Sequence, residues 1–88
     1  MSELLRILEV GEALLTSDRT LAGLLEISGS SRASVMRRLA ELRHMGCVIA
    51  SVREAGRSVY RLENPAEVCG RLMSWARLER DRDLRAGG

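Results

Sequence analysis

The first fifteen residues carry apolar side chains at the spacing of a helix. Ser2 suits the cap of this helix, which we expect to run from about Ser2 to Leu15. Its main apolar stripe consists of four residues on one line: Leu4, Leu8, Gly11 and Leu15. Leu5 and Val10 lie off the stripe, so they are either scattered surface residues or covered by a second element, such as another subunit.

After a polar connection over residues 16–19, the pattern indicates two further helices joined by a short turn. Thr20 can cap the first of them, and Gly29 can end it with a positive φ. Ser30 or Ser31 then caps a longer helix that extends to about Met45. The apolar face of this longer helix is Val35, Leu39 and Leu42, and its opposite face is Ala33, Ser34, Arg37, Glu41 and His44, flanked by Arg32 and Arg38.

Two segments rich in β-branched residues follow, over residues 47–52 and 59–62, and they indicate a pair of strands. The connection between them, from Arg53 to Ser58, contains Gly56 and two arginines. It is longer than a tight hairpin loop, and we therefore expect a projecting wing.

The final helix has a clear start signal, with Asn64 as the cap, Pro65 at the first helical position and Glu67 reaching back. Its apolar stripe is Val68, Leu72, Trp75 and Ala76, after which the chain becomes almost wholly charged. We therefore divide the chain into a domain over residues 1–63, a dimerisation helix over residues 64–82 and a flexible tail over residues 83–88.

This order predicts an α+β fold, mainly α: a winged helix-turn-helix with three helices and a two-stranded wing, followed by a C-terminal helix. The charge distribution favours a nucleic-acid-binding module. Residues 31–62 carry seven arginines and two carboxylates, a net charge of +5, whereas residues 1–30 carry two arginines and five carboxylates, a net charge of −3.

Other classes of protein are disfavoured by what the sequence contains. A single histidine, without a catalytic arrangement or a phosphate-binding glycine loop, predicts no enzyme, no catalytic residues, no metal and no cofactor. Cys47 and Cys69 lack metal-like spacing and are expected to be reduced thiols. Glu3, Glu9 and Glu12 interrupt the apolar run that a signal peptide or membrane span requires, so we expect a cytoplasmic protein with no membrane partner.

Over roughly residues 3–62 the chain resembles the DNA-binding domain of IclR-type winged helix-turn-helix transcription regulators. The resemblance rests on Thr20-Leu21-Ala22, Ser28-Gly29, Ser31 to Val35 with Arg37, Leu42, Gly46-Cys47-Val48 and Tyr60-Arg61-Leu62. Ser30 departs from the apolar residue that usually follows the turn glycine in such families. The effector domain of full-length IclR regulators has no counterpart in these 88 residues, so the resemblance implies DNA binding without an attached small-molecule sensor.

If the helix over residues 31–45 enters a major groove, its exposed N-terminal side meets the bases first. The candidate contacts on this helix are Ser31, Arg32, Ala33, Ser34, Arg37 and Arg38. Arg37 points most directly outward and is the best candidate for a base contact. In the wing over residues 53–58, Arg53 and Arg57 are candidates for phosphate or minor-groove contacts. For each arginine the alternative is a solvated surface.

We also expect a two-fold homodimer that places two recognition helices about one DNA turn apart. The candidate dimer residues are Leu5, Val68, Leu72 and Trp75, and the alternative is that the last helix packs back onto the first. The sequence thus predicts a homodimeric regulator of transcription, a repressor that binds specific double-stranded DNA. A winged-helix module that binds protein and no DNA is the alternative, favoured by the modest net charge of +2 and the acidic first helix.

Overall fold

The computed structural model describes residues 2–29 and 31–87. Over these residues the chain is α+β and mainly helical, with four helices and a three-stranded antiparallel sheet. The helices are α1 (Glu3–Thr16), α2 (Leu21–Ser28), α3 (Arg32–His44) and α4 (Pro65–Gly87), and the strands are β1 (Arg19–Thr20), β2 (Ile49–Glu54) and β3 (Arg57–Leu62). This layout is compatible with a winged helix-turn-helix.

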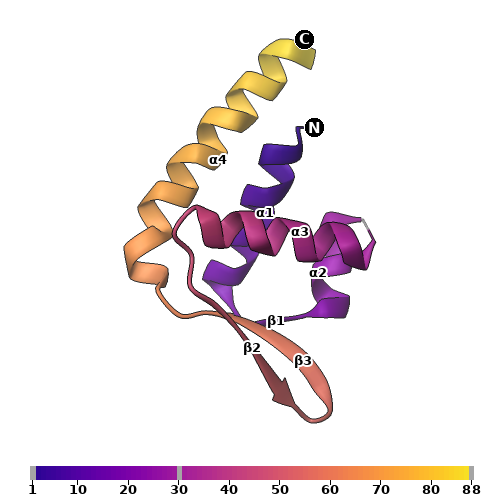
Figure 1. The fold of residues 1–88 in the computed structure, drawn as a ribbon. Coiled ribbons are helices and arrows are strands. Elements are labelled where there is room, and N and C mark those ends of the chain that lie inside the picture. Colours follow the sequence, from indigo (N-terminus) through magenta and orange to yellow (C-terminus); the bar gives the residue numbers. More distant parts are fainter. Residues whose placement is uncertain (1, 30, 88) are drawn as a thin grey trace.

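The long helices α1 and α4 run antiparallel to each other, and the β2–β3 hairpin projects from the far end of the molecule (Figure 1). Ser2 at the start of α1 donates a hydrogen bond to Glu79 near the end of α4, with an oxygen–oxygen distance of 3.3 Å. Both chain ends therefore lie away from the hairpin tip (Figure 1).

The predicted caps of α1, α2 and α3 are confirmed. The hydroxyls of Ser2, Thr20 and Ser31 each accept a hydrogen bond from the backbone N–H three residues later. A cap of this kind stabilises a helix by about 1 kcal/mol. Gly29 ends α2 with a φ of 62°, in the left-handed region that glycine enters without strain. Ser30, the other predicted cap of α3, lies outside the described residues.

The core is aliphatic and joins all four helices to the sheet. Its fully buried side chains include Leu8, Leu24, Val35, Leu39, Leu42, Val68 and Leu72. Gly11 lets α1 approach its neighbours closely, because a Cβ there would lie 3.0 Å from Leu42 Cδ2 and 3.3 Å from Leu72 Cδ1. The helix predicted to stand apart, α4, thus shares one core with the rest of the chain.

The sheet differs from the predicted two-stranded wing in two respects. First, Arg19 of the expected connection and the cap residue Thr20 form a short strand, β1, which pairs with β3 and gives the strand order β1-β3-β2. Second, the hairpin turn is tight, since Glu54 pairs with Arg57 and only two residues lie between them. Ala55 and Gly56 form this turn with positive φ values of 51° and 77°, as a type I′ turn requires.

The C-terminal helix also differs from its prediction. It continues through Gly87, so residues 83–87 are helical and do not form a tail; Gly88 lies outside the described residues. As predicted, α4 begins at Pro65, Asn64 lies at the cap position and Glu67 reaches back to it. The Asn64 side chain, however, joins separate segments and does not accept from the first N–H groups of the helix. Its Oδ1 accepts from the Val48 N–H at 2.8 Å, and its Nδ2 donates to the Gly46 carbonyl at 2.9 Å and to Glu67 at 2.6 Å.

Candidate nucleic-acid interface

Helix α3 presents one face to the core and the opposite face to solvent. Val35, Leu39 and Leu42 are buried, as predicted. At 100° per residue Arg37 lies on the opposite side, and its side chain is exposed. Ser31, Arg32 and Ala33 are exposed at the N-terminal end of the helix, where backbone N–H groups and the positive end of the helix dipole are available.

Ser34 is less accessible than its predicted role requires. It is half-buried, and its hydroxyl accepts a hydrogen bond from Ser31 Oγ at 3.2 Å. The Ser31 hydroxyl also accepts from the Ser34 N–H at 3.3 Å, which is the cap of α3. The two serines therefore organise the end of the helix that carries Arg32 and Ala33.

Arg38 was predicted as a DNA contact, and the structure corrects this. Its side chain is only 2% exposed and lies against α1, where Nε and Nη2 donate to the two carboxylate oxygens of Glu3 at 2.9 and 3.1 Å. These hydrogen bonds lower the pKa of Glu3. Arg38 is therefore held inside the fold and is not offered to a ligand, because a carboxylate of another helix meets it.

The hairpin separates its two candidate arginines onto opposite faces. Arg53 is paired with Ser58, and it lies on the same face as Tyr60, two residues further along β3. The Tyr60 hydroxyl reaches Met36 Sδ on α3 at 3.8 Å, so this face leads towards α3. Arg57 is paired with Glu54 and lies on the other face. Both arginines are exposed.

The second face of the hairpin also carries a charge network. Arg61 contacts Asp18 at 2.8 Å and Glu54 at 3.1 Å, and the Asp18 hydrogen bond raises the pKa of Arg61. Arg57 thus shares its face with carboxylates, whereas Arg53 does not share its face with Glu54. The difference between Arg53 and Arg57 was missed at the sequence level, because strand alternation assigns faces only once the turn length is known.

Electrostatic partners divide the fourteen arginines into three groups. Five form ion pairs: Arg38, Arg61, Arg80, Arg82 and Arg85. Three donate to backbone carbonyls: Arg19, Arg43 and Arg71. Six make no ion pair or hydrogen bond within residues 2–29 and 31–87: Arg6, Arg32, Arg37, Arg53, Arg57 and Arg77. Four of these six lie on α3 and the hairpin, so unneutralised positive charge concentrates there.

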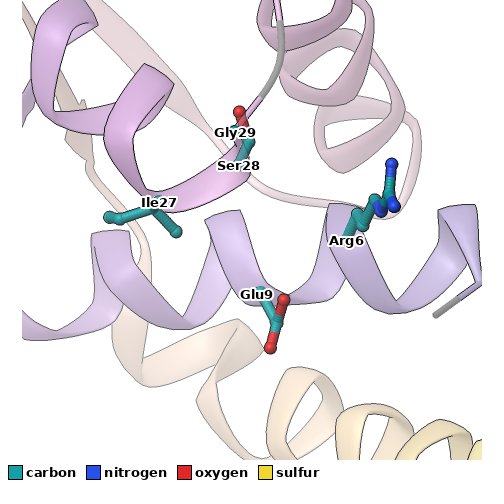
Figure 2. A pocket seen from close by; sticks show the side chains of 5 residues that line it. All are labelled: Arg6, Glu9, Ile27, Ser28 and Gly29. Atoms are coloured by element: carbon teal, nitrogen blue, oxygen red, sulfur yellow. The ribbon is translucent and has the colours of Figure 1, made fainter.

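A hollow of about 190 Å³ lies between α1 and the end of α2. Figure 2 shows Arg6 and Glu9 projecting to opposite sides of α1, while Ile27, Ser28 and Gly29 come from the other wall. Its polar groups do not converge on a common point, so the hollow is a groove between helices and is not organised as a binding site.

The predicted dimer residues are mostly inside the fold. Leu5, Val68 and Leu72 are no more than 3% exposed, because α1 and α4 pack against each other along this stripe. Trp75 is 37% exposed, and the Arg71 guanidinium lies 6.0 Å from the centre of its ring. Leu5, Val68 and Leu72 are therefore corrected to core residues, in agreement with the alternative that α4 packs onto α1.

We also searched the part of the chain that the structure describes for metal sites, membrane-spanning helices and reactive cysteines. No three His, Cys, Asp or Glu side chains gather there as a metal site would require, and no helix there is both long and apolar enough to cross a membrane. Cys47 and Cys69 are free, and burial raises the pKa of the Cys47 thiol. Neither cysteine has the environment of a reactive thiolate.

Comparison of the chain with models of protein families, with curated proteins and with solved structures found no match.

Proposed function

We propose that the protein is a regulator of transcription that binds specific double-stranded DNA as a homodimer and acts as a repressor. Helix α3 with its cap, residues 31–45, enters the major groove, and the hairpin around residues 53–58 lies on the DNA backbone or in the minor groove. The observation that carries this proposal is the concentration of arginines without carboxylate partners on α3 and the hairpin: Arg32, Arg37, Arg53 and Arg57.

The exposed end of α3 suits base and phosphate contacts. Ser31 and Arg32 stand beside the N-terminal N–H groups of the helix, which favour phosphate oxygens. Ala33 offers a methyl group to thymine, and Arg37, one turn further on, can pair with guanine through O6 and N7. Arg37 is the residue we assign to sequence discrimination.

Arg38 contributes differently, by positioning α3. Its two hydrogen bonds to Glu3 tie the middle of α3 to the first turn of α1. The direction in which the neighbouring Arg37 points is therefore supported by a contact about 100° further round the helix. A site on a helix braced in this way keeps its geometry when the ligand arrives.

The proposal is tested by selection of bound sequences from random double-stranded DNA, followed by titration of the selected site at several salt concentrations. Affinity is expected to fall steeply with salt, since each arginine–phosphate contact releases counterions. Arg37→Ala is expected to reduce affinity for the selected site by about 1–3 kcal/mol and to reduce discrimination against random DNA.

The matched control is Arg82→Ala, which removes an exposed arginine from α4, away from α3 and the hairpin. It should leave DNA affinity nearly unchanged. Equal losses from the two substitutions, or no binding at low salt, would refute the assignment of α3 to the major groove.

The alternative function, a protein-interaction module that binds no DNA, draws support from apolar side chains on the surface of α4, such as Met73, Leu78 and Leu84. The same DNA titration decides between the two functions. Failure to bind any DNA at low salt favours the protein-binding module.

A further inference from the structure

One flank of α4 exposes an apolar and charged stripe. Met73 and Leu84 are 53% and 76% exposed, and Arg77 lies between them on the same flank. The spacings of four and seven residues place these three side chains in one line along the helix. We name the surface made by Met73, Arg77, Asp81 and Leu84 the α4 flank.

The α4 flank borders two hollows in the groove between α1 and α4. One, of about 350 Å³, is lined by Glu12, Met73, Arg77, Arg80, Asp81 and Leu84. The other, of about 300 Å³, is lined by Glu12, Leu15, Thr16, Cys69 and Met73. The two share Glu12 and Met73, so they form a continuous depression that begins beside Met73 with apolar walls.

The charges of the α4 flank are complementary to those of the same flank on an antiparallel second copy. Arg77 makes no ion pair within the described part of the chain, and Asp81, one turn later, contacts only the exposed Arg85 at 3.0 Å. An antiparallel copy of α4 centred near residue 79 would place Arg77 opposite Asp81 of the partner subunit. Two-fold symmetry makes this pair twice.

The same register matches the apolar residues. It brings Met73 within one residue of the position opposite Leu84 of the partner subunit, beside the hollow lined by Leu15 and Cys69. We propose that a second copy of this chain docks on the α4 flank in this antiparallel arrangement. The proposal deepens the homodimer of the proposed function by assigning its interface.

The opposite flank of α4 is a poor site for a second copy. Arg71, Trp75, Leu78 and Arg82 form its line, with Leu78 60% exposed. An antiparallel pairing centred on this line, between residues 76 and 77, would bring Arg71 opposite Arg82 of the partner subunit, so like charges would meet at both ends. This flank serves as the internal comparison in the test.

Among the described residues, no other helix lies beside the last two turns of α4. The contact between Ser2 and Glu79 marks the start of α1, and α4 continues for two further turns that include Leu84. These turns lie at the end of the molecule opposite the hairpin tip (Figure 1). Docking there leaves the exposed arginines of the hairpin uncovered.

The test is sedimentation velocity of the intact chain without DNA, from low micromolar to submillimolar concentration. We expect a monomer–dimer equilibrium that Met73→Glu and Leu84→Glu each weaken at least about 10-fold, since each places a charge in an apolar contact. Leu78→Glu, on the opposite flank, should leave it unchanged. Circular dichroism of each variant verifies that α4 remains folded.

Charge reversal tests the register itself. Arg77→Asp and Asp81→Arg should each weaken the dimer several-fold by opposing like charges, and the double variant should restore it. A wild-type chain that stays monomeric throughout, a dimer that only Leu78→Glu disrupts, or a double variant without recovery would overturn the proposal. Because no DNA is present, these outcomes are independent of whether α3 binds DNA.

Discussion

Ion pairing of arginines differs between two regions of the molecule, the one formed by α3 and the β2–β3 hairpin and the one formed by α1 and α4. In the helical pair, Arg80 is bound by Glu12, Arg82 contacts Glu79 and Arg85 contacts Asp81. On α3 and the hairpin, the exposed side chains of Arg32, Arg37, Arg53 and Arg57 make no ion pair, and among the exposed arginines only Arg61 contacts carboxylates in the described part of the chain. A net charge of +2 hides this contrast, because the carboxylates that balance the arginines lie mostly elsewhere in the fold.

Two adjacent arginines show the contrast most sharply. The Arg37 side chain is exposed and makes no ion pair or hydrogen bond with the described residues, whereas Arg38 is buried and doubly bonded to Glu3. Two arginines one residue apart thus have different environments: one side chain is exposed to solvent, and the other bonds two helices together. The difference arises because α1 packs alongside α3. The following predictions test this division, beginning with the largest effect.

Arg38→Ala is expected to reduce the free energy of unfolding by about 2–3 kcal/mol, because it removes the packing of a buried side chain and its two hydrogen bonds to Glu3. Urea denaturation followed by circular dichroism measures this change. Arg37→Ala is the matched control and should alter stability by less than about 0.5 kcal/mol. Equal stability of the two variants would contradict the claim that Arg38 stabilises the fold and Arg37 does not.

The two faces of the hairpin can be compared through Arg53 and Arg57. Arg53→Ala is expected to weaken DNA binding several-fold and to lower the salt slope by about 1, because its face leads towards α3. Arg57→Ala should have a smaller effect, since its face carries Glu54. Fluorescence anisotropy with the selected DNA measures both slopes, and a larger effect of Arg57→Ala would reverse the assignment of the faces.

A substitution in the hairpin turn should increase the stability of the protein. Ala55 adopts a φ of 51°, which is unfavourable for alanine, whereas asparagine is preferred there before glycine. Ala55→Asn is therefore expected to raise the free energy of unfolding by about 1 kcal/mol, measured as a rise in Tm. The same change at Ala22, exposed within α2, should lower stability slightly because asparagine is a weaker helix former.

The smallest expected effect is the dependence of stability on pH through Glu3. The hydrogen bonds from Arg38 lower the pKa of Glu3 below its ordinary value of 4.5, so the ionised form favours the folded state. This contribution is complete above pH 4.5 and is lost as the pH falls through the lowered pKa. Glu3→Gln should therefore be less stable than the wild type at neutral pH, and the difference should shrink in acid. Denaturation at several pH values measures it, and a difference that grows in acid would contradict the assignment.

Local features could be predicted from the sequence. The caps by Ser2, Thr20 and Ser31, the left-handed Gly29 and the buried face of α3 all depend on residues within a few positions of one another. Helical spacing alone therefore places Arg37 on the exposed side. Each of these predictions is confirmed because local hydrogen bonds and periodicity determine it.

Features that depend on distant partners could not be predicted in this way. The spacing placed Arg38 beside the exposed face, but its burial depends on a carboxylate 35 residues away. The stripe containing Val68 and Leu72 was recognised correctly, but it packs on α1 of the same chain. The hairpin turn was expected to span residues 53–58, because the β-branched segments end at Val52 and resume at Val59, but pairing continues to Glu54 and Arg57. Ala55-Gly56 is not the usual pair for a type I′ turn.

The bonds of Asn64 have a mechanical consequence. One side chain holds the first turn of α4 to Gly46 and Val48, and Arg71 adds a bond from α4 to the Met45 carbonyl at 3.2 Å. These hydrogen bonds fix the start of α4 to the segment that leads into the hairpin. A change in the tilt of α4 would therefore act on residues 45–48, the connection between α3 and the hairpin, as well as on α1.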